Sequence, residues 1–459
     1  MPVDTTHPEY DAHLPYWQRM RDAAAGEDAV KDRGSGYLPI PSGIAGEARP
    51  EQSDAYRNYL SRARYPESVQ PAIEGMVGLM SRKPPDIELP NALEYMREQA
   101  TADGLPLDAL IDRMRQEVST VGRYILLVDV DEEGNPYIAT YPAEACINWR
   151  GDGERLTLLV LEETVEDESD DPFERELVTQ WRACRVDDGV YTVELYRKGE
   201  NDSEPQLVET VEPERAGGGE LDFVPAVIVG SRDLLPTPDS MPLLPVANKS
   251  LHYYRRAADH GLQLYMCAHG TTPYLFGVSE EEQPKTIGPP ALWTSETSDA
   301  KAGFIEVSGT GLEQSASDLE QIRLEIIQAT VQAMSESKRD AEAAETLRLR
   351  FQAQTATLSS IAMSTAKGIE RALQYAAYWA GVASEPAEES VTVEQSTAFI
   401  TEQPDPNMLT AIYDGIERGF IPQEILARYT RRTELHEFED EEFVQRTAEG
   451  LAEAPEDDG

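Results

Sequence analysis

The residues of this chain that could do chemistry do not fall into a catalytic pattern. Its histidines are accompanied by no Ser or Cys signature such as GxSxG. His252 and His260 are eight residues apart, near one face of an expected helix, and we interpret them as core or subunit-contact residues. Cys146, Cys184 and Cys267 are far apart and in no CxxC arrangement. They are therefore predicted to be buried thiols, with neither a disulfide framework nor a zinc site.

The carboxylates are numerous, but their spacing is not that of metal ligands. Residues 129–134 begin like an EF-hand loop, yet the final position is Thr140, where a bidentate Glu is required, so we predict a hairpin turn. The acidic runs 162–171 and 437–442 show no regular ligand spacing, and we interpret them as solvated loops and faces. The alternative is a metal-dependent nuclease or phosphodiesterase built on these clusters. These residues favour no enzyme, no cofactor and no metal site.

Lys338 and Arg339 are adjacent cations in a polar break, SESKRD, at 335–340. The chain holds only eight lysines, so the pair is conspicuous. The two cations could form a solvated helix end, or a basic loop that touches phosphate groups. Both interpretations remain open.

Two long helical patterns precede this break and flank a short Pro/Gly-rich β segment. The first covers about 242–268 and the second about 311–334, and a third, from about 341 to 380, would be roughly 60 Å long at a rise of 1.5 Å per residue. Short strands, TPYLFG, ALWTS and GFIEV, lie between the first two. The first helix repeats its apolar residues at spacings of three and four, on one face: Ala247, Leu251, Tyr254, Ala258, Leu262 and Tyr265. This order of elements is typical of a tube wall and not of a catalytic pocket.

The first half of the chain combines helices with a β-rich block. A Gly/Pro-rich arm follows the first helix, and strand-like runs with turn signals between them predict an antiparallel layer packed on helices. The expected elements are a helix at 14–25, the arm at 34–50, a helix from Pro66 to before Pro84, a helix at 106–121, the β block at 119–230, a returning strand near 390–400 and short helices at 405–450.

Composition excludes several classes of protein. Asp plus Glu number 85 against 40 Lys plus Arg, a formal net charge of −45, so the chain as a whole repels nucleic acid. High salt screens such self-repulsion, which favours adaptation to a salty cytoplasm over the alternative, codon bias. No run approaches the roughly twenty apolar residues that span a bilayer, and the N-terminus lacks the features of a signal peptide. We therefore expect no membrane association.

The ordered segments resemble the portal proteins of tailed bacteriophages, a family first catalogued as a domain of unknown function. The resemblance rests on HPEYDAHLPYWQRMRDAAAGEDAVKDRG, YRNYLSRARYPESVQPAIEGMVGLMSRKPP, VSTVGRYILLVDV followed by CINWR, PLLPVANKSLHYYRRAADHG, and RLRFQAQTATLSSIAMSTAKGIERALQYAAYWAG followed by VTVEQSTAF. These segments span about residues 7 to 400. The resemblance is weakest in the C-terminal part.

The resemblance implies an α+β portal fold with a β-rich wing, two stem helices flanking a small clip, one very long helix and a C-terminal helical crown. The implied regions are 1–239 wing, 240–268 first stem helix, 269–310 clip, 311–334 second stem helix, 335–340 tunnel loop, 341–404 long helix and returning wing strand, and 405–459 crown with an acidic tail.

The function that the resemblance implies is a homo-oligomeric ring, usually a dodecamer, at one capsid vertex of a virion. Duplex genomic DNA would be packaged and ejected through it, and in the host cytoplasm it would assemble with the major capsid protein. Lys338 and Arg339 would face the DNA channel, and Trp293 and Phe304 of the clip would dock terminase and then head-completion or adaptor proteins. A helical assembly scaffold is a further alternative, which the β block disfavours.

Overall fold

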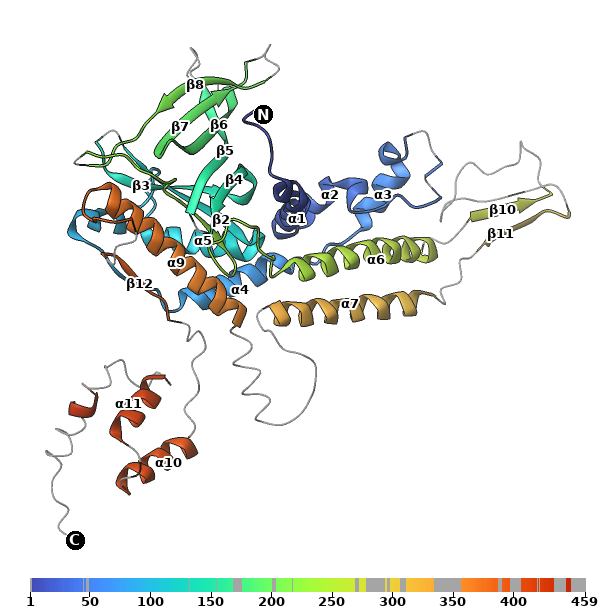
Figure 1. Cartoon of the computed structure of the whole chain (residues 1–459). Helices are drawn as coiled ribbons and strands as arrows, with labels where there is room; N and C mark the ends of the chain where they lie inside the picture. Colours follow the sequence, from blue (N-terminus) through green and yellow to red (C-terminus); the bar gives the residue numbers. More distant parts are fainter. Residues whose placement is uncertain are drawn as a thin grey trace, which may run out of the picture.

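The structure, a computed structural model, describes residues 2–43, 45–46, 49–131, 133–153, 155–167, 176–199, 204–216, 218–268, 272–277, 294, 298–305, 311–333, 356–386, 390–396, 406–418, 420, 422–432 and 443–446. Within these ranges the protein is mixed α+β, as predicted. A β-rich body carries a stalk of two long helices that ends in a small hairpin (Figure 1).

A three-stranded antiparallel sheet lies at the centre of the body. Its order is β3-β2-β9, from Pro136–Pro142, Arg123–Val130 and Ala226–Gly230. The sequence of β2, RYILLVDV, is nearly all apolar, and its first six residues are buried. Helices α5, Leu107–Val121, and α9, Ala356–Trp379, contact this sheet. The continuous apolar run of β2 is explained by this cover of helices.

A second sheet is a five-stranded antiparallel meander. Its strands, in spatial and chain order, are β4 Cys146–Asp152, β5 Arg155–Asp167, β6 Glu176–Asp187, β7 Val190–Arg197 and β8 Gln206–Val211. The antiparallel layer predicted for 119–230 is confirmed, although β8 was not among the predicted strands. The acidic run at 162–171 was predicted to be solvated, and for Glu163 this was wrong. Glu163 lies within β5 with a side chain only 11% exposed, because Arg182 on β6 donates to it at 2.8 Å.

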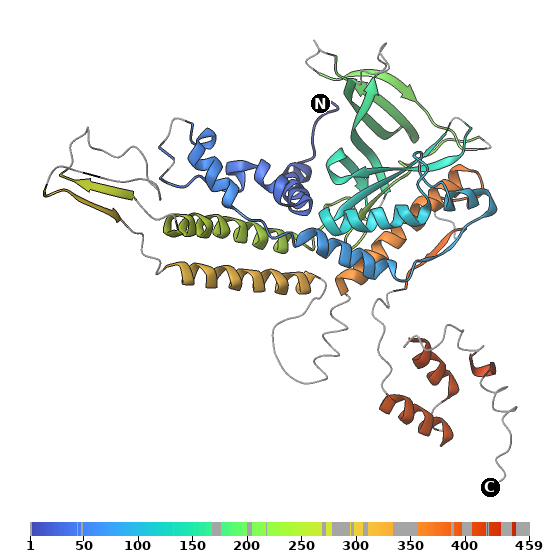
Figure 2. The same cartoon turned by 180° about the vertical axis from the view of Figure 1, so that it is seen from behind.

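Of the N-terminal helices, the first three lie beside the stalk, whereas the fourth packs against α5 in the body (Figures 1 and 2). The first begins at Pro8 and not at Leu14, because His7 accepts a hydrogen bond from the Glu9 amide at 3.2 Å and so caps it. The helix expected from Pro66 begins only at Val69, because Pro66 O is engaged in a tight turn with Ser68 N at 2.7 Å. These helices are α1 Pro8–Ala25, α2 Glu27–Asp32, α3 Asp54–Arg62 and α4 Val69–Ser81.

Smaller elements complete the body. The turn predicted after residue 129 is confirmed, since Asp131 accepts from the amides of Glu133 and Asn135 between β2 and β3. The returning strand is also present and pairs antiparallel with a strand before α5. These elements are β1 Asp86–Glu88, β12 Thr392–Glu394 and the short 3-10 turns η1 Gly34–Gly36, η2 Pro50–Gln52, η3 Asn91–Arg97 and η4 Ala143–Ala145.

The stalk consists of α6, Leu244–Ala268, and α7, Leu312–Ala333, which lie side by side in both views (Figures 1 and 2). The strands β10, Thr272–Phe276, and β11, Lys301–Ile305, form an antiparallel hairpin at its far end. Both predicted helices are therefore confirmed. The predicted strand ALWTS, 291–295, lies outside the described residues except for residue 294, which is in no strand.

The third long helix is described only in part. Its C-terminal portion is α9, Ala356–Trp379, and the predicted beginning at 341–355 lies outside the described residues. Toward the C-terminus, α10, Pro406–Glu417, and α11, Gln423–Arg432, contact each other. The short helices predicted for this part of the chain are thus confirmed.

Two of the three cysteines are buried as free thiols. Cys146 and Cys184 are buried free thiols, as predicted, but Cys267 near the end of α6 is only partly buried. The α6 helix leaves its last turns uncovered, which explains that difference. Among the described helices, none has the length and apolarity that crossing a bilayer demands.

Candidate functional site

The site residues expected from the sequence are at the edges of what the structure describes. Lys338, Arg339 and Trp293 lie outside the described residues. Phe304 is on β11, opposite Pro273 of β10, and its side chain is likewise outside the description. The channel and docking roles of these residues stay predictions, and the stalk that would position them is the candidate functional site.

Helix α6 is attached to the body by contacts along one side. Tyr59 of α3 donates to Asp259 at 2.6 Å, and the Arg62 guanidinium lies 4.0 Å from the centre of the Tyr265 ring. Gly261 allows this approach, since a Cβ there would lie 3.3 Å from the Arg62 carbonyl oxygen. Helix α3 therefore contacts α6 from Asp259 to Tyr265, near the hairpin end of the stalk.

Helix α7 is held to α6 by an apolar seam. Ile322, Ile326 and Ala329 on α7 are at most 5% exposed, as the helical period predicted, and they belong to the same core cluster as Leu251 and Tyr254 of α6.

Ion pairs flank this seam. Lys249 donates to Glu325 at 2.7 Å and Arg256 to Asp318 at 2.8 Å. The hydrogen bond from Lys249 is the main reason that the pKa of Glu325 is lowered from its usual value. Because the partners are 37–44% exposed, these pairs fix the register of the two helices and stabilise the stalk only weakly.

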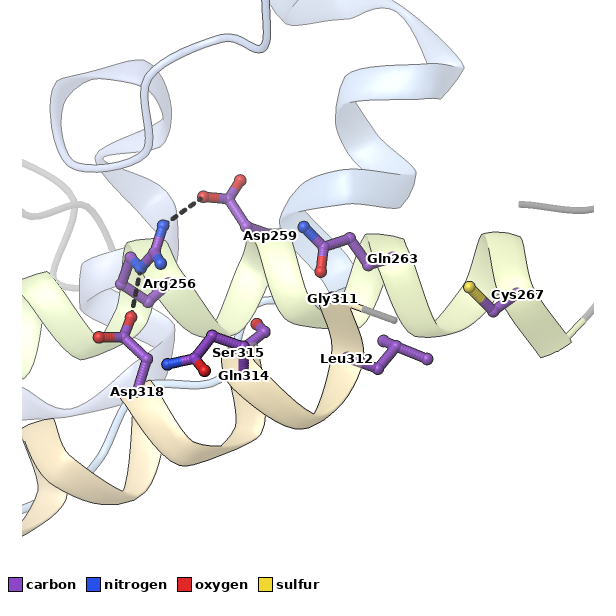
Figure 3. Close-up of a pocket in the computed structure, with 9 residues that line it drawn as sticks. All are labelled: Arg256, Asp259, Gln263, Cys267, Gly311, Leu312, Gln314, Ser315 and Asp318. Carbon is purple, nitrogen blue, oxygen red and sulfur yellow. Dashed lines mark hydrogen bonds and ion pairs between the residues drawn. The ribbon is translucent and has the colours of Figure 1, made fainter. Parts of the chain in front are cut away.

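A polar groove lies between the two helices toward the hairpin end (Figure 3). Its volume is about 520 Å³, and it is lined by Arg256, Asp259, Gln263 and Cys267 of α6 and by Gly311, Leu312, Gln314, Ser315 and Asp318 at the start of α7. Arg256 lies between Asp259 and Asp318, at 3.9 and 2.8 Å. The groove presents a cation, Arg256, flanked by carboxylates and other polar groups.

The histidines on α6 do not meet across a described contact. His260 is hydrogen-bonded to Ser315 of α7 at 3.1 Å, within the same chain. His252 and Arg255 are exposed on α6, and Arg255 donates to Tyr37 O at 2.8 Å. The exposed arginines of α6, Arg255 and Arg256, are both cations, and we call this surface the basic face of α6, although the chain as a whole is strongly acidic.

The outward side of α7 carries a second apolar stripe that the sequence analysis missed. Leu324, Ile327 and Val331 are 53, 53 and 48% exposed, and they recur at spacings of three and four on the side opposite the seam. Glu313 and Glu320 continue the same side toward the hairpin end. This second stripe has the same helical period as the seam, on the opposite side of α7. We call these five residues the outer stripe.

The hairpin at the end of the stalk is small. β10 and β11 pair over five residues each, and Phe276 at the end of β10 is 70% exposed. A two-stranded hairpin without a covering layer is marginally stable in water. These strands therefore need more contact than the described part of one chain supplies.

No group of three or more His, Cys, Asp or Glu side chains among the described residues is arranged to hold a metal ion. The carboxylates of β5 that belonged to the nuclease alternative are engaged in other contacts. Glu163 accepts from Arg182, and Glu162 accepts from the Trp181 indole at 3.2 Å. Nothing in this part of the chain favours that alternative.

Comparison with known proteins gives one family match. A family model described as a domain of unknown function (DUF4055) matches residues 242–380, which contain the stalk, its hairpin and α9. No curated protein matches this chain.

Some solved structures are similar in part. They include a chain of the "neck of empty GTA particle computed with C6 symmetry", 12% identical over 78% of this chain and 88% of the other, with a TM-score of 0.37. A chain of the "virion of native gene transfer agent (GTA) particle" is 11% identical over 76% and 84%, with a TM-score of 0.34. A third, from the "neck of native GTA particle computed with C12 symmetry", is 12% identical over 77% and 86%, with a TM-score of 0.33. Scores this low do not establish a shared fold.

Proposed function

We propose that this chain is the subunit of a portal-like ring, a conduit at one capsid vertex through which duplex DNA is packaged and ejected. The observation that carries the proposal is the outer stripe on α7. A projecting helix that buries one apolar seam and exposes a second needs another surface to cover it. In a closed ring each subunit presents this face to the next, so that no copy is left uncovered.

The occupant of the outer stripe is a second copy of this chain, and its acceptor is the basic face of α6. Rotation about a ring axis parallel to the stalk keeps every residue at its own height, so residues at one level meet across the contact. The Arg256–Asp318 pair marks such a level within one subunit. Glu320 of one copy would then meet Arg255 of the next, and attraction between the charges would orient the subunits.

The remaining regions take the roles that the resemblance implies. The wing is 1–239, the clip 269–310, the tunnel loop 335–340, and the crown begins at 405. The exposed Phe276 supports a clip whose strands are completed by neighbouring subunits and which docks terminase and then adaptor proteins through Trp293 and Phe304. The major capsid protein would surround the wing. The chain would act without catalysis.

Electron microscopy and native mass spectrometry of the purified protein test the ring. Ile327→Glu should abolish rings and leave folded monomer, because it places a charge in the stripe without touching the seam. Gln328→Glu is the matched control, since it adds the same charge at the next exposed position. A wild-type monomer at every salt concentration, or full rings from Ile327→Glu, would refute the proposal.

A second experiment tests the channel. Lys338→Glu with Arg339→Glu should leave rings intact and reduce the DNA content of particles, because the cations are the weak attraction in a repelling wall. Normal DNA content would show that these two residues form a solvated helix end. Deletion of 272–306 should abolish packaging, and motor docking that survives the deletion would refute the clip assignment.

A further inference from the structure

The outermost strand of the meander, β8, is a free sheet edge. Within the described chain β8 pairs with β7 on one side and with no strand on the other. All six of its residues are exposed. The opposite edge of the same sheet, β4, is instead covered by the N-terminal segment, since His7 N donates to Ile147 O at 2.8 Å. Because the β4 edge is covered and the β8 edge is not, a further strand could pair with β8.

Three of the six β8 side chains are apolar although they are exposed. Leu207, Val208 and Val211 are 52, 59 and 43% exposed. Leu207 lies opposite Tyr196 of β7, and Val211 lies opposite Val193, on different faces of the ladder because a register shift separates the two pairs. Apolar surface therefore continues past the last strand on both faces of the sheet. An added strand would find neighbours on either side.

Proteins usually protect a free edge with lysine, proline, an inward charge or a bulge. β8 contains neither Lys nor Pro. It does have a bulge, because the register shift leaves Val208 as an extra residue between Leu207 and Glu209. The bulge bends the edge and prevents unlimited flat stacking of copies. It leaves the rest of the strand able to pair with one specific partner.

The charge of the edge determines the kind of partner. The segment 204–214 carries Glu204, Glu209, Glu212 and Glu214, all exposed, and no cation. The next cation, Arg215, is occupied: it donates to Tyr378 O and Ala383 O, both at 3.1 Å. A second copy of a chain with net charge −45 would be repelled from this edge, whereas a basic strand would be attracted.

We propose that β8 is a docking site for an extended, net-basic segment of a partner protein, which adds as a sixth strand to the meander. Main-chain hydrogen bonds along the edge would supply affinity, and the carboxylates of 204–214 would select the basic partner. This surface is separate from the outer stripe and does not depend on ring formation.

Synthetic peptides test the proposal on the full-length chain. A fluorescent peptide of about eight residues, alternating Val or Thr with Arg or Lys, should bind, with an affinity that falls as salt rises. An isomer with Glu in place of the cations should not bind. Two further versions carry N-methyl groups on alternate amides, one set along each edge of the strand. The version that blocks the pairing edge should bind at least about tenfold more weakly, because several backbone hydrogen bonds are lost.

Variants of the protein locate the site. Leu207→Lys with Val208→Lys should remove binding, and Leu235→Lys with Met363→Lys is the matched control, since these residues are 42 and 39% exposed and belong to other segments. Circular dichroism shows whether each variant is folded, and repeating the titration on Ile327→Glu separates this site from the ring. Equal binding of both N-methylated peptides would reduce the interaction to charge alone and overturn the proposal. So would absence of binding, or edge variants that change only self-association.

Discussion

Arg182 is one of the residues that join the two sheets of the body. Its guanidinium donates to Glu163 of β5 at 2.8 Å and to Asp129 of β2 at 3.1 Å. Tyr141 of β3 donates to the same Glu163 at 2.7 Å. The side chains of Arg182, Glu163 and Asp129 are 22, 11 and 24% exposed, so water solvates them little. The positive charge of Arg182 therefore compensates the two carboxylates. One residue thus connects strands of both sheets.

Arg182→Leu should therefore lower the free energy of unfolding by about 3 kcal/mol, because it leaves two carboxylates without their cation. Urea unfolding of the variant and the wild-type protein measures this loss. The control is Arg57→Leu, which breaks a pair whose arginine is 65% exposed and should change stability by less than about 1 kcal/mol. Equal losses for the two variants would contradict the assignment.

The buried tyrosines are expected to lower the stability of the body at high pH. Tyr10 is 8% exposed, and burial is the main reason that its pKa is raised to about 12. Burial also raises the pKa of Tyr191 well above its usual value. A raised folded-state pKa means that the contribution to stability is complete below about pH 10, where the unfolded tyrosine ionises, and is lost as the pH rises toward the folded value.

Stability should accordingly fall from about pH 10 upward, at up to about 1.4 kcal/mol per pH unit for each such tyrosine. Tyr10→Phe should make that fall less steep, because phenylalanine does not ionise. Urea unfolding combined with the ultraviolet absorbance of tyrosinate follows both effects. An unchanged slope in Tyr10→Phe would show that Tyr10 ionises without unfolding.

At the scale of elements, the fit of α9 on the central sheet depends on one missing side chain. A Cβ at Gly368 would lie 2.5 Å from Val229 Cγ2 on β9, and Val229 is fully buried. A β-branched residue in a packed strand has little freedom to move away. The glycine therefore sets how closely helix and sheet approach.

Gly368→Ala should destabilise the protein by about 1–3 kcal/mol through overpacking, in spite of the better helix propensity of alanine. Gly78→Ala is the matched control, since Gly78 is also within a helix, is exposed, and has nothing within 4 Å of an added Cβ. That variant should stabilise by roughly 0.5–1 kcal/mol. Adding Val229→Ala to Gly368→Ala tests the contact directly, and a purely additive result in this double-mutant cycle would contradict it.

At the scale of the whole molecule, charge is the dominant fact. With a net charge of −45, the chain repels itself and other copies of itself, and the range of that repulsion falls from about 30 Å at 0.01 M salt to about 3 Å at 1 M. A ring would concentrate this charge around its axis. Assembly is then expected to require screening.

The melting temperature and the fraction of chains in rings should both increase as salt rises toward about 1 M. As salt falls, rings should dissociate or the chains should unfold. Scanning calorimetry and native electrophoresis over a salt series measure the two quantities. Stability that stays flat or decreases with rising salt would favour codon bias as the origin of the acidic composition.

The sequence alone determined those elements whose pattern is local. The period of α6 and α7 predicted both stalk helices and their seam at Ile322 and Ile326, and the strand-like run RYILLVDV predicted the strand β2. Hydrophobic period reports which face is covered, and this is a property of neighbouring residues. The start of α1 was misjudged because its cap, His7, is a residue type outside the usual capping set.

Only the tertiary structure decided which surfaces remain uncovered. The sequence of β8 does not show that one side of the strand is left unpaired, and the outer stripe of α7 becomes distinct only when the seam is seen to be filled. The acidic run in β5 was likewise predicted to be solvated, but its Glu163 is paired with Arg182 and is only 11% exposed. Pairing between distant segments brings these groups together, and no local period encodes it, because exposure depends on what the rest of the chain covers.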